Sequence, residues 1–200
     1  MPTGDVREEK AALRRRMRSA LREFAATDAC RSASAAIRGH LLHLLPEEMS
    51  LTGPGSVAAF AALPGEPDLL ALVESLPGVT WTFPRVVGVD LAFHRIEQER
   101  DLIAASFGIR EPADDRSTRL SIDEIAAFLV PGLAFDPLSG RRLGRGRGFY
   151  DRSLADARPG ARFIGVGFDC QMTPVPVEAH DQLLHLIVTE SGVHRAHAEV

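Results

Sequence analysis

The sequence has no long apolar run. None of its hydrophobic stretches reaches the roughly 20 residues that a membrane-spanning helix needs. Residues 1–24 are polar and charged, and they include acidic side chains but no apolar core of the kind that a secretory signal peptide carries. We therefore expect a cytoplasmic protein that does not bind membranes.

Cysteine and net charge are also low. The two cysteines, Cys30 and Cys170, are too few for a disulfide framework or a cysteine-based zinc site, and we expect both to be reduced thiols. With 23 basic and 27 acidic residues, the formal net charge is −4, which gives no general attraction for nucleic acid. Any anion site must then be a local cluster. We expect a monomer that acts on small molecules and does not bind nucleic acid.

Lysine is nearly absent, because Lys10 is the only lysine among the 23 basic residues. A codon bias toward arginine explains the excess, and a lysine retained under such a bias indicates a need for ammonium chemistry, since arginine does not replace it at a phosphate. Apolar residues recur every three or four positions between residues 13 and 24, which predicts an amphipathic helix over 6–25. Lys10 falls in its apolar sector and Arg14 on the edge. Either they lie along the helix margin with their charged ends in water, or they reach a site.

The rest of the chain alternates between predicted strands and helices, after a second helix that begins at Thr27 and Asp28 and ends near residue 45. The predicted strands are 56–63, 79–86, 89–96, 126–135, 162–168 and 183–189, and the predicted helices are 67–76 and 149–157, with a helical turn at 121–125. This alternation favours an α/β fold with a mostly parallel sheet covered on both faces. Because the chain has no repeat or evident linker, we expect a single domain over residues 1–200.

Polar residues follow several of the predicted strands. Glu66 comes after the first strand, Arg85 lies at the end of the second, a Gly/Arg loop follows 126–135, and Asp169 follows 162–168. In open α/β sheets, ligands bind outside the carboxyl ends of the strands. The sequence therefore predicts a site assembled from several distant segments.

The stretch RLGRGRGFYDRSL, residues 142–154, predicts a phosphate site. Its glycines let backbone N–H groups turn toward an anion, its arginines supply forked hydrogen bonds, and the helix that follows presents its positive end. Asp151 opposes a bare phosphate but suits a Mg²⁺ ion bound to a nucleotide. The stretch does not fit the spelling of the Walker loop, the dinucleotide fingerprint or the RNA-recognition signature. A surface hairpin with Asp151 as a helix-start residue is the alternative.

The segment LVPGLAFDPLSGRRLGRGRGFYDRSL, residues 129–154, resembles the signature of the 5-formyltetrahydrofolate cyclo-ligase family, also called methenyltetrahydrofolate synthetase. Further family-like pieces follow the family's order: KAALR (10–14), GEPD (65–68), FPR (83–85), GIREP (108–112) and PVEAHD (176–181). The resemblance implies a three-layer α/β/α sandwich with the N-terminal helices packed on the sheet. It also implies an ATP- and Mg²⁺-dependent ligase that converts 5-formyltetrahydrofolate to 5,10-methenyltetrahydrofolate through phosphorylation of the formyl oxygen, with release of ADP and phosphate.

The resemblance further implies roles for the residues that match family motifs. It implies that Lys10 and Arg145 are catalytic. It implies ATP contacts for Lys10, Arg14, Arg142, Leu143, Gly144, Arg145, Gly146, Arg147, Gly148, Phe149 and Tyr150. It places Glu66, Phe60, Ala61 and Tyr150 at the folate, and Asp151 and Asp181 at Mg²⁺. His180 stays unassigned, and His185 departs from the family, in which many relatives carry an acid.

Two other functional classes stay open at this point. A sugar-phosphate isomerase or an acyl-transferase could use the same kind of layered fold, since fold does not fix function, and neither would need Mg-ATP. A folate- or nucleotide-binding regulator could keep the motifs without turnover. Formation of the methenyl product with and without Mg-ATP distinguishes these classes.

Overall fold

The computed structural model describes residues 5–105, 109–178 and 181–196. Its first helix, α1 (Val6–Ala25), spans the residues that the apolar spacing predicts. Asp5 caps this helix, because its side chain accepts a hydrogen bond from the Arg7 N–H at 3.0 Å. The predicted apolar side of α1 is buried against the rest of the chain.

The second helix, α2 (Asp28–Thr52), continues beyond the predicted end near residue 45. Pro46 lies inside it, where a proline removes a backbone hydrogen bond. Tertiary contacts hold the additional turns. Glu48 accepts a hydrogen bond from Arg162 Nε at 2.6 Å, and the Thr52 carbonyl accepts one from Arg158 at 3.0 Å. These partners are distant in sequence, so the local pattern around the proline could not predict the longer helix.

An eight-stranded sheet forms the centre of the described structure, in the order β12-β11-β10-β7-β1-β2-β3-β6. From β11 to β2 the neighbouring strands are parallel, whereas β12 at one edge and β3 and β6 at the other are antiparallel to their neighbours. The predicted mostly parallel sheet is therefore confirmed. Its strands are β1 (Ser56–Ala58), β2 (Thr80–Val87), β3 (Asp90–Ile96), β6 (Arg119–Leu120), β7 (Ile125–Val130), β10 (Arg162–Val166), β11 (Leu186–Thr189) and β12 (Gly192–Arg195).

Both faces of the sheet are covered, which makes three layers. Alternate residues of the central strands enter two different cores, as the pleat of a strand requires. On one face, Val57 and Leu129 pack in a cluster with apolar residues of α1, α2 and α3 (Ala71–Ser75). On the other face, Ala58 and Phe128 pack with α4 (Phe149–Ala155) through Leu154. The α/β sandwich with N-terminal helices packed on the sheet is confirmed.

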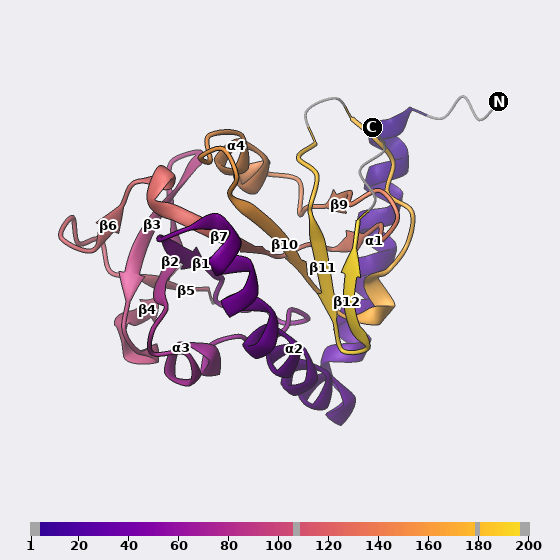
Figure 1. Cartoon of the computed structure of the whole chain (residues 1–200). Coiled ribbons are helices and arrows are strands. Elements are labelled where there is room, and N and C mark those ends of the chain that lie inside the picture. The colour runs from indigo at the N-terminus through magenta and orange to yellow at the C-terminus, as the bar shows by residue number, and fades with distance from the viewer. Residues whose placement is uncertain (1–4, 106–108, 179–180, 197–200) are drawn as a thin grey trace.

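The predicted strand 126–135 is two strands in the structure. Pro131, which has no N–H to donate, follows the last residue of β7 and ends the strand. The chain then forms β8 (Ala134–Phe135), which pairs antiparallel with β9 (Arg142–Leu143). Each strand has two residues, too few for a visible period in the sequence. Figure 1 shows β9 beside α1, so this hairpin brings the Gly/Arg loop to the N-terminal helix.

Several predicted elements are shorter than expected. The first strand ends at Ala58 rather than residue 63, and α3 covers only part of the predicted helix 67–76. A second hairpin of β4 (Leu102–Ala104) and β5 (Arg110–Pro112) was not predicted. Short 3-10 turns are η1 (Glu99–Asp101), η3 (Ile122–Glu124), which matches the predicted turn at 121–125, and η4 (Asp169–Gln171). Within the described ranges, no helix is long and apolar enough to cross a bilayer.

Candidate active site

The Gly/Arg loop, residues 144–148, is an ordered connection between β9 and α4, as the sequence predicts. Gly146 and Gly148 adopt φ values of 105° and 67°, a region of backbone space that favours glycine. Gly148 is also the N-cap of α4, the residue directly before its first turn. The spacing of glycines in the sequence is therefore a requirement of the loop's backbone path.

A pocket of about 330 Å³ lies between this loop, α1 and the segment around residue 181. It brings together ten of the predicted site residues: Lys10, Arg14, Arg142, Leu143, Gly144, Gly146, Arg147, Gly148, Asp151 and Asp181. Arg7 and Glu178, for which no role was predicted, complete its wall. Glu178 lies in the PVEAHD motif three residues before Asp181, which was the available signal for it.

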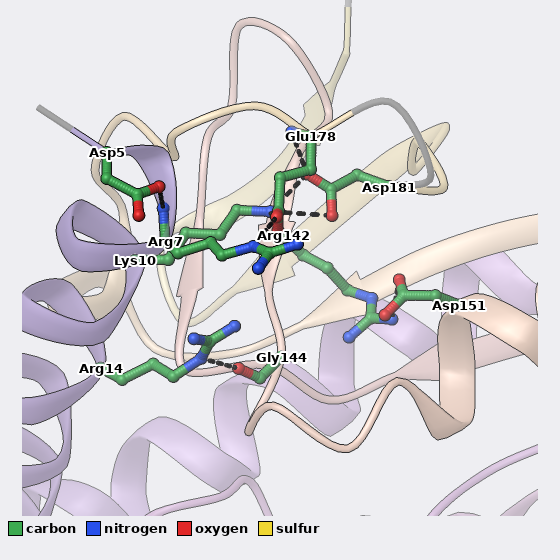
Figure 2. Close-up of polar contacts among 9 residues, drawn as sticks. All are labelled: Asp5, Arg7, Lys10, Arg14, Arg142, Gly144, Asp151, Glu178 and Asp181. Carbon is green, nitrogen blue, oxygen red and sulfur yellow. Dashed lines mark hydrogen bonds and ion pairs between the residues drawn. The ribbon is translucent and has the colours of Figure 1, made fainter. Parts of the chain in front are cut away.

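Lys10 reaches into this pocket from the apolar side of α1. Only 3% of its side chain is exposed, so it does not lie along the helix margin in water. Its Nζ donates to Asp181 at 2.6 and 2.9 Å and to Glu178 at 2.8 Å (Figure 2). An ammonium group between two carboxylates is strongly held, and it shows why the helix tolerates a charge on its apolar side.

Arg142 and Asp151 form a second ion pair on the opposite wall. Arg142 Nη2 donates to Asp151 Oδ1 at 2.7 Å, and the Arg142 side chain is 4% exposed (Figure 2). Burial lowers the pKa of Arg142 below its usual value, and the Asp151 carboxylate opposes that shift. Arg142 Nε has no hydrogen-bond partner among the described residues. A donor buried beside a pocket is suited to a ligand oxygen.

Two arginines of α1 hold the loop in place. Arg14 Nε donates to the Gly144 carbonyl at 3.1 Å, and Arg18 donates to the Arg145 carbonyl at 3.1 Å. Both contacts join residues more than 120 positions apart. Arg14, which the apolar spacing places on the edge of the buried side, is half-buried and reaches the loop, whereas the next residue, Arg15, is exposed.

Arg145 points away from this pocket and pairs with Glu66. Its Nε and Nη2 donate to Glu66 Oε1 at 3.0 and 2.7 Å, and the Leu63 N–H donates to the other carboxylate oxygen at 2.9 Å. The Glu66 side chain is 5% exposed. Burial raises the pKa of Glu66, and Arg145 offsets this effect only in part. A carboxylate predicted at the folate and an arginine predicted at ATP are thus in direct contact.

Tyr150 packs beside the buried Arg142 side chain. Its ring is 5.6 Å from the Arg142 guanidinium carbon, and its hydroxyl has no hydrogen-bond partner among the described residues. Burial raises the pKa of the Tyr150 phenol, and the negative charge of Glu66 raises it further. The phenol is therefore a neutral donor close to Glu66, available for a ligand atom.

The other predicted residues take different positions. Phe60 is buried in the core on the α1 face, and Ala61 packs against that core. Phe149 contacts the Arg152 guanidinium rather than lining the pocket, with a ring-to-carbon distance of 5.7 Å. His180 lies outside the described residues. His185 Nδ1 accepts the Phe163 N–H at 3.0 Å, and the His185 ring contacts the Phe163 ring edge-on, away from the pocket.

Two residues of the predicted strand-end cluster do not join the pocket. Arg85 donates to the Pro112 carbonyl at 2.9 Å, and Asp169 accepts a hydrogen bond from Ser191 at 2.8 Å. Each is satisfied by a neighbouring segment. Of the strand-end residues, the loop lines this pocket and Glu66 contacts the loop through Arg145, whereas Arg85 and Asp169 pair with other segments.

The pocket suits a metal ion that arrives with a phosphate ligand. No group of three or more His, Cys, Asp or Glu side chains able to hold a metal ion occurs in the described part of the chain. Asp151 and Asp181 nevertheless line one pocket together with cationic groups. Mg²⁺ is commonly held by one or two carboxylates together with substrate phosphates and water, so two carboxylates fit a nucleotide-bound Mg²⁺.

The fold and this geometry define an α/β protein with a glycine-rich, cationic pocket and, on the other side of the same loop, the buried carboxylate of Glu66. Sequence comparison identifies its family. The model of the 5-formyltetrahydrofolate cyclo-ligase family matches residues 6–190, and the chain belongs to this family of enzymes.

Individual relatives agree with this assignment. The chain is 35% identical to the 5-formyltetrahydrofolate cyclo-ligase of Mycolicibacterium smegmatis over 147 residues, 69% of this chain and 75% of that protein. It is 32% identical to the Escherichia coli 5-formyltetrahydrofolate cyclo-ligase over 149 residues, 69% of this chain and 79% of that one. The solved structure of Aquifex aeolicus 5,10-methenyltetrahydrofolate synthetase is similar with a TM-score of 0.77 and 28% identity, covering 93% of this chain and 92% of that one.

Proposed function

We propose that this chain catalyses the ATP- and Mg²⁺-dependent cyclisation of 5-formyltetrahydrofolate to 5,10-methenyltetrahydrofolate, with release of ADP and phosphate. The observation that carries the proposal is the pocket in which Lys10, Arg142 and the Gly/Arg loop face the carboxylates of Asp151 and Asp181. Membership of the cyclo-ligase family supports this reaction over the other classes that the sequence leaves open.

The pocket is the proposed nucleotide site. Lys10, Arg14, Arg142 and Arg147 would offset the negative charge of the phosphates, and the loop backbone at Gly144, Gly146 and Gly148 would approach them closely. In the structure, Asp181 and Asp151 neutralise Lys10 and Arg142. If the phosphates become the partners of Lys10 and Arg142, the carboxylates of Asp181 and Asp151 lose their counter-charges and need another cation. Mg²⁺, held by Asp151 and Asp181 with the nucleotide, would neutralise charge on the transferred phosphoryl group.

The region around Glu66 is the proposed folate site. The Glu66 carboxylate would accept hydrogen bonds from N–H groups of the pterin, and Tyr150 would donate its unpartnered hydroxyl. Phe60 and Ala61 end the buried stretch that follows β1 and support this side of the site. Because Tyr150 contacts Arg142 and lies close to Glu66, the two substrates would meet at the start of α4.

The chemistry requires a leaving group in place of the formyl oxygen. That oxygen attacks the γ-phosphorus of ATP, the bond to the β-phosphate oxygen breaks, and ADP leaves. The folate then carries an iminium phosphate at nitrogen 5. Nitrogen 10 attacks the same carbon and loses its proton, and the carbon–oxygen bond breaks to release phosphate. The oxygen of the formyl group thus departs in the phosphate.

The protein's contribution to these steps is positioning and charge stabilisation. Phosphoryl transfer needs the acceptor oxygen in line with the leaving oxygen, and cationic groups placed around the phosphate lower the barrier. Lys10 is held in position by two carboxylates and Arg142 by one, so neither must be ordered when the substrate arrives. The steps involve no protein nucleophile.

The direct test is a spectrophotometric assay of the methenyl product. The purified chain is mixed with 5-formyltetrahydrofolate and ATP, with Mg²⁺ or with a chelator, and the product absorbance is followed. We expect product only when ATP and Mg²⁺ are both present. Product without ATP would support a different reaction, and absence of product with retained ligand binding would support a regulator.

A further inference from the structure

Arg145 differs from its neighbours in the Gly/Arg loop. Gly144 and Gly146 line the nucleotide pocket, whereas the Arg145 side chain leaves the loop on the other side and pairs with Glu66. The backbone of Arg145 therefore lies beside the proposed nucleotide site, and its side chain lies in the proposed folate site. About 38% of the Arg145 side chain is exposed, so water and ligands can reach it, while Glu66 is enclosed.

Glu66 depends on this contact. Its two oxygens are satisfied by Arg145 and by the Leu63 N–H. Removing one member of a buried ion pair leaves an uncompensated charge, which is strongly unfavourable. Arg145 can therefore leave only when other donors, or a proton, replace it. The pterin ring of a reduced folate carries adjacent N–H donors that match a carboxylate in this way.

The same arginine has a second set of available partners. Phosphate oxygens in the neighbouring pocket would attract its guanidinium, which can form bidentate hydrogen bonds with them. The Arg145 carbonyl is held to α1 by Arg18, and the following Gly146 has a positive φ of 105°. The side chain can thus change partners while the loop stays anchored at its backbone.

We propose that Arg145 couples the two substrates: it neutralises Glu66 in the ligand-free chain and moves to the phosphates when Mg-ATP binds, which makes Glu66 available to the pterin. This inference rests on the proposed function. The exchange of partners makes nucleotide and folate binding mutually favourable. The nucleotide draws Arg145 away from Glu66, which the folate needs, and the folate takes over Glu66, which frees Arg145 for the nucleotide. Such coupling is reciprocal, so each ligand strengthens binding of the other by the same factor.

The test measures binding in a thermodynamic cycle by titration calorimetry. The ligands are 5-formyltetrahydrofolate and Mg²⁺ with adenylyl imidodiphosphate, a non-hydrolysable ATP analogue. In the unmodified chain we expect the saturating analogue to tighten folate binding by about fivefold or more, the usual lower range for coupled sites. Equal folate affinity with and without the analogue overturns the coupling.

Glu66→Gln separates this account from a purely structural role of the ion pair. With the carboxylate neutral, Arg145 no longer has to leave a buried charge, so the variant should bind the analogue more tightly than the unmodified chain in the absence of folate. Folate binding should weaken, and the coupling factor should fall to about one. The matched control is Glu74→Gln, a change of the same kind on the exposed side of α3, which should alter none of these values. Unchanged or weaker analogue binding by Glu66→Gln overturns the inference.

A second variant tests the same contact from the arginine side. Arg145→Ala also removes the contact, and it should abolish the coupling while the folate still binds. If the unmodified chain binds both ligands independently, the coupling fails and the proposed function stands. If the unmodified chain binds neither ligand, the proposed function fails, and this inference fails with it.

Discussion

Lys10 and Asp181 are 171 positions apart in the chain, and Lys10 Nζ lies 2.6 Å from Asp181 Oδ2. This contact joins the first helix to the segment before β11 and closes one side of the pocket formed by the Gly/Arg loop. The single lysine of the chain therefore occupies a position where its charge is enclosed.

Lys10→Arg tests whether the site requires an ammonium group. The position is buried between two carboxylates, and a planar guanidinium cannot direct its donors to the same oxygens. We expect kcat/KM for ATP to fall by about 10- to 150-fold, the effect of losing one charge-assisted contact. Steady-state kinetics measures the change, with Arg15→Lys on the exposed side of α1 as the control. Full activity of Lys10→Arg would show that positive charge alone is sufficient.

Asp151→Asn tests the proposed magnesium contact. The substitution removes a carboxylate while keeping nearly the same volume, and it leaves the buried Arg142 without its acidic partner. We expect the Mg²⁺ concentration for half-maximal activity to rise by about tenfold or more, in line with the loss of a charged contact. A titration of activity with Mg²⁺ at saturating ATP measures this value. An unchanged midpoint in a folded variant would remove Asp151 from the metal site.

Glu66→Gln should change the stability of the folded chain by an amount that depends on pH. Burial raises the pKa of Glu66 in the folded chain above its unfolded value of about 4.3. Ionising it therefore costs stability, and this cost grows as the pH rises from the unfolded pKa through the folded pKa. We expect the Tm of Glu66→Gln minus that of the unmodified chain to increase as the pH rises above the unfolded pKa of about 4.3. A difference that stays constant as the pH rises would mean that the Glu66 pKa is not raised.

Gly148→Ala tests the backbone path of the loop. Gly148 has a φ of 67°, where a side chain costs about 1–2 kcal/mol, and it is the N-cap of α4. We expect thermal unfolding to show a loss of that size together with weaker ATP use. Gly39→Ala is the matched control, because Gly39 lies within α2 with open space around it and alanine favours a helix. Its stability should stay equal or rise.

Local sequence patterns predict the elements with a strong period and the loop with an unusual composition. The helix over 6–25, the mostly parallel sheet and the place of the glycine-rich loop directly before α4 agree with the structure. The β8–β9 hairpin could not be predicted, because two residues per strand show no alternation. The extension of α2 beyond Pro46 depends on Arg162 and Arg158, which come more than 100 positions later.

Most of the residues that line the pocket could be predicted from the sequence, but the ion pairs that the arginines of this region form could not. Lys10, the loop and Asp181 are marked by composition or by family motifs, and the structure brings them together. The pairing of Arg145 with Glu66 and of Arg142 with Asp151 depends on which way each arginine turns from the loop. Sequence spacing carries no information on that direction, because a flexible side chain flanked by glycines can reach either site.

The fate of the formyl oxygen tests the central claim most directly. The chain is incubated with Mg-ATP and 5-formyltetrahydrofolate labelled with ¹⁸O in the formyl group, and the released phosphate is analysed by mass spectrometry. Transfer of the phosphoryl group to the formyl oxygen predicts one ¹⁸O atom in each phosphate formed. Unlabelled phosphate, with the isotope recovered in water, would contradict the proposed reaction.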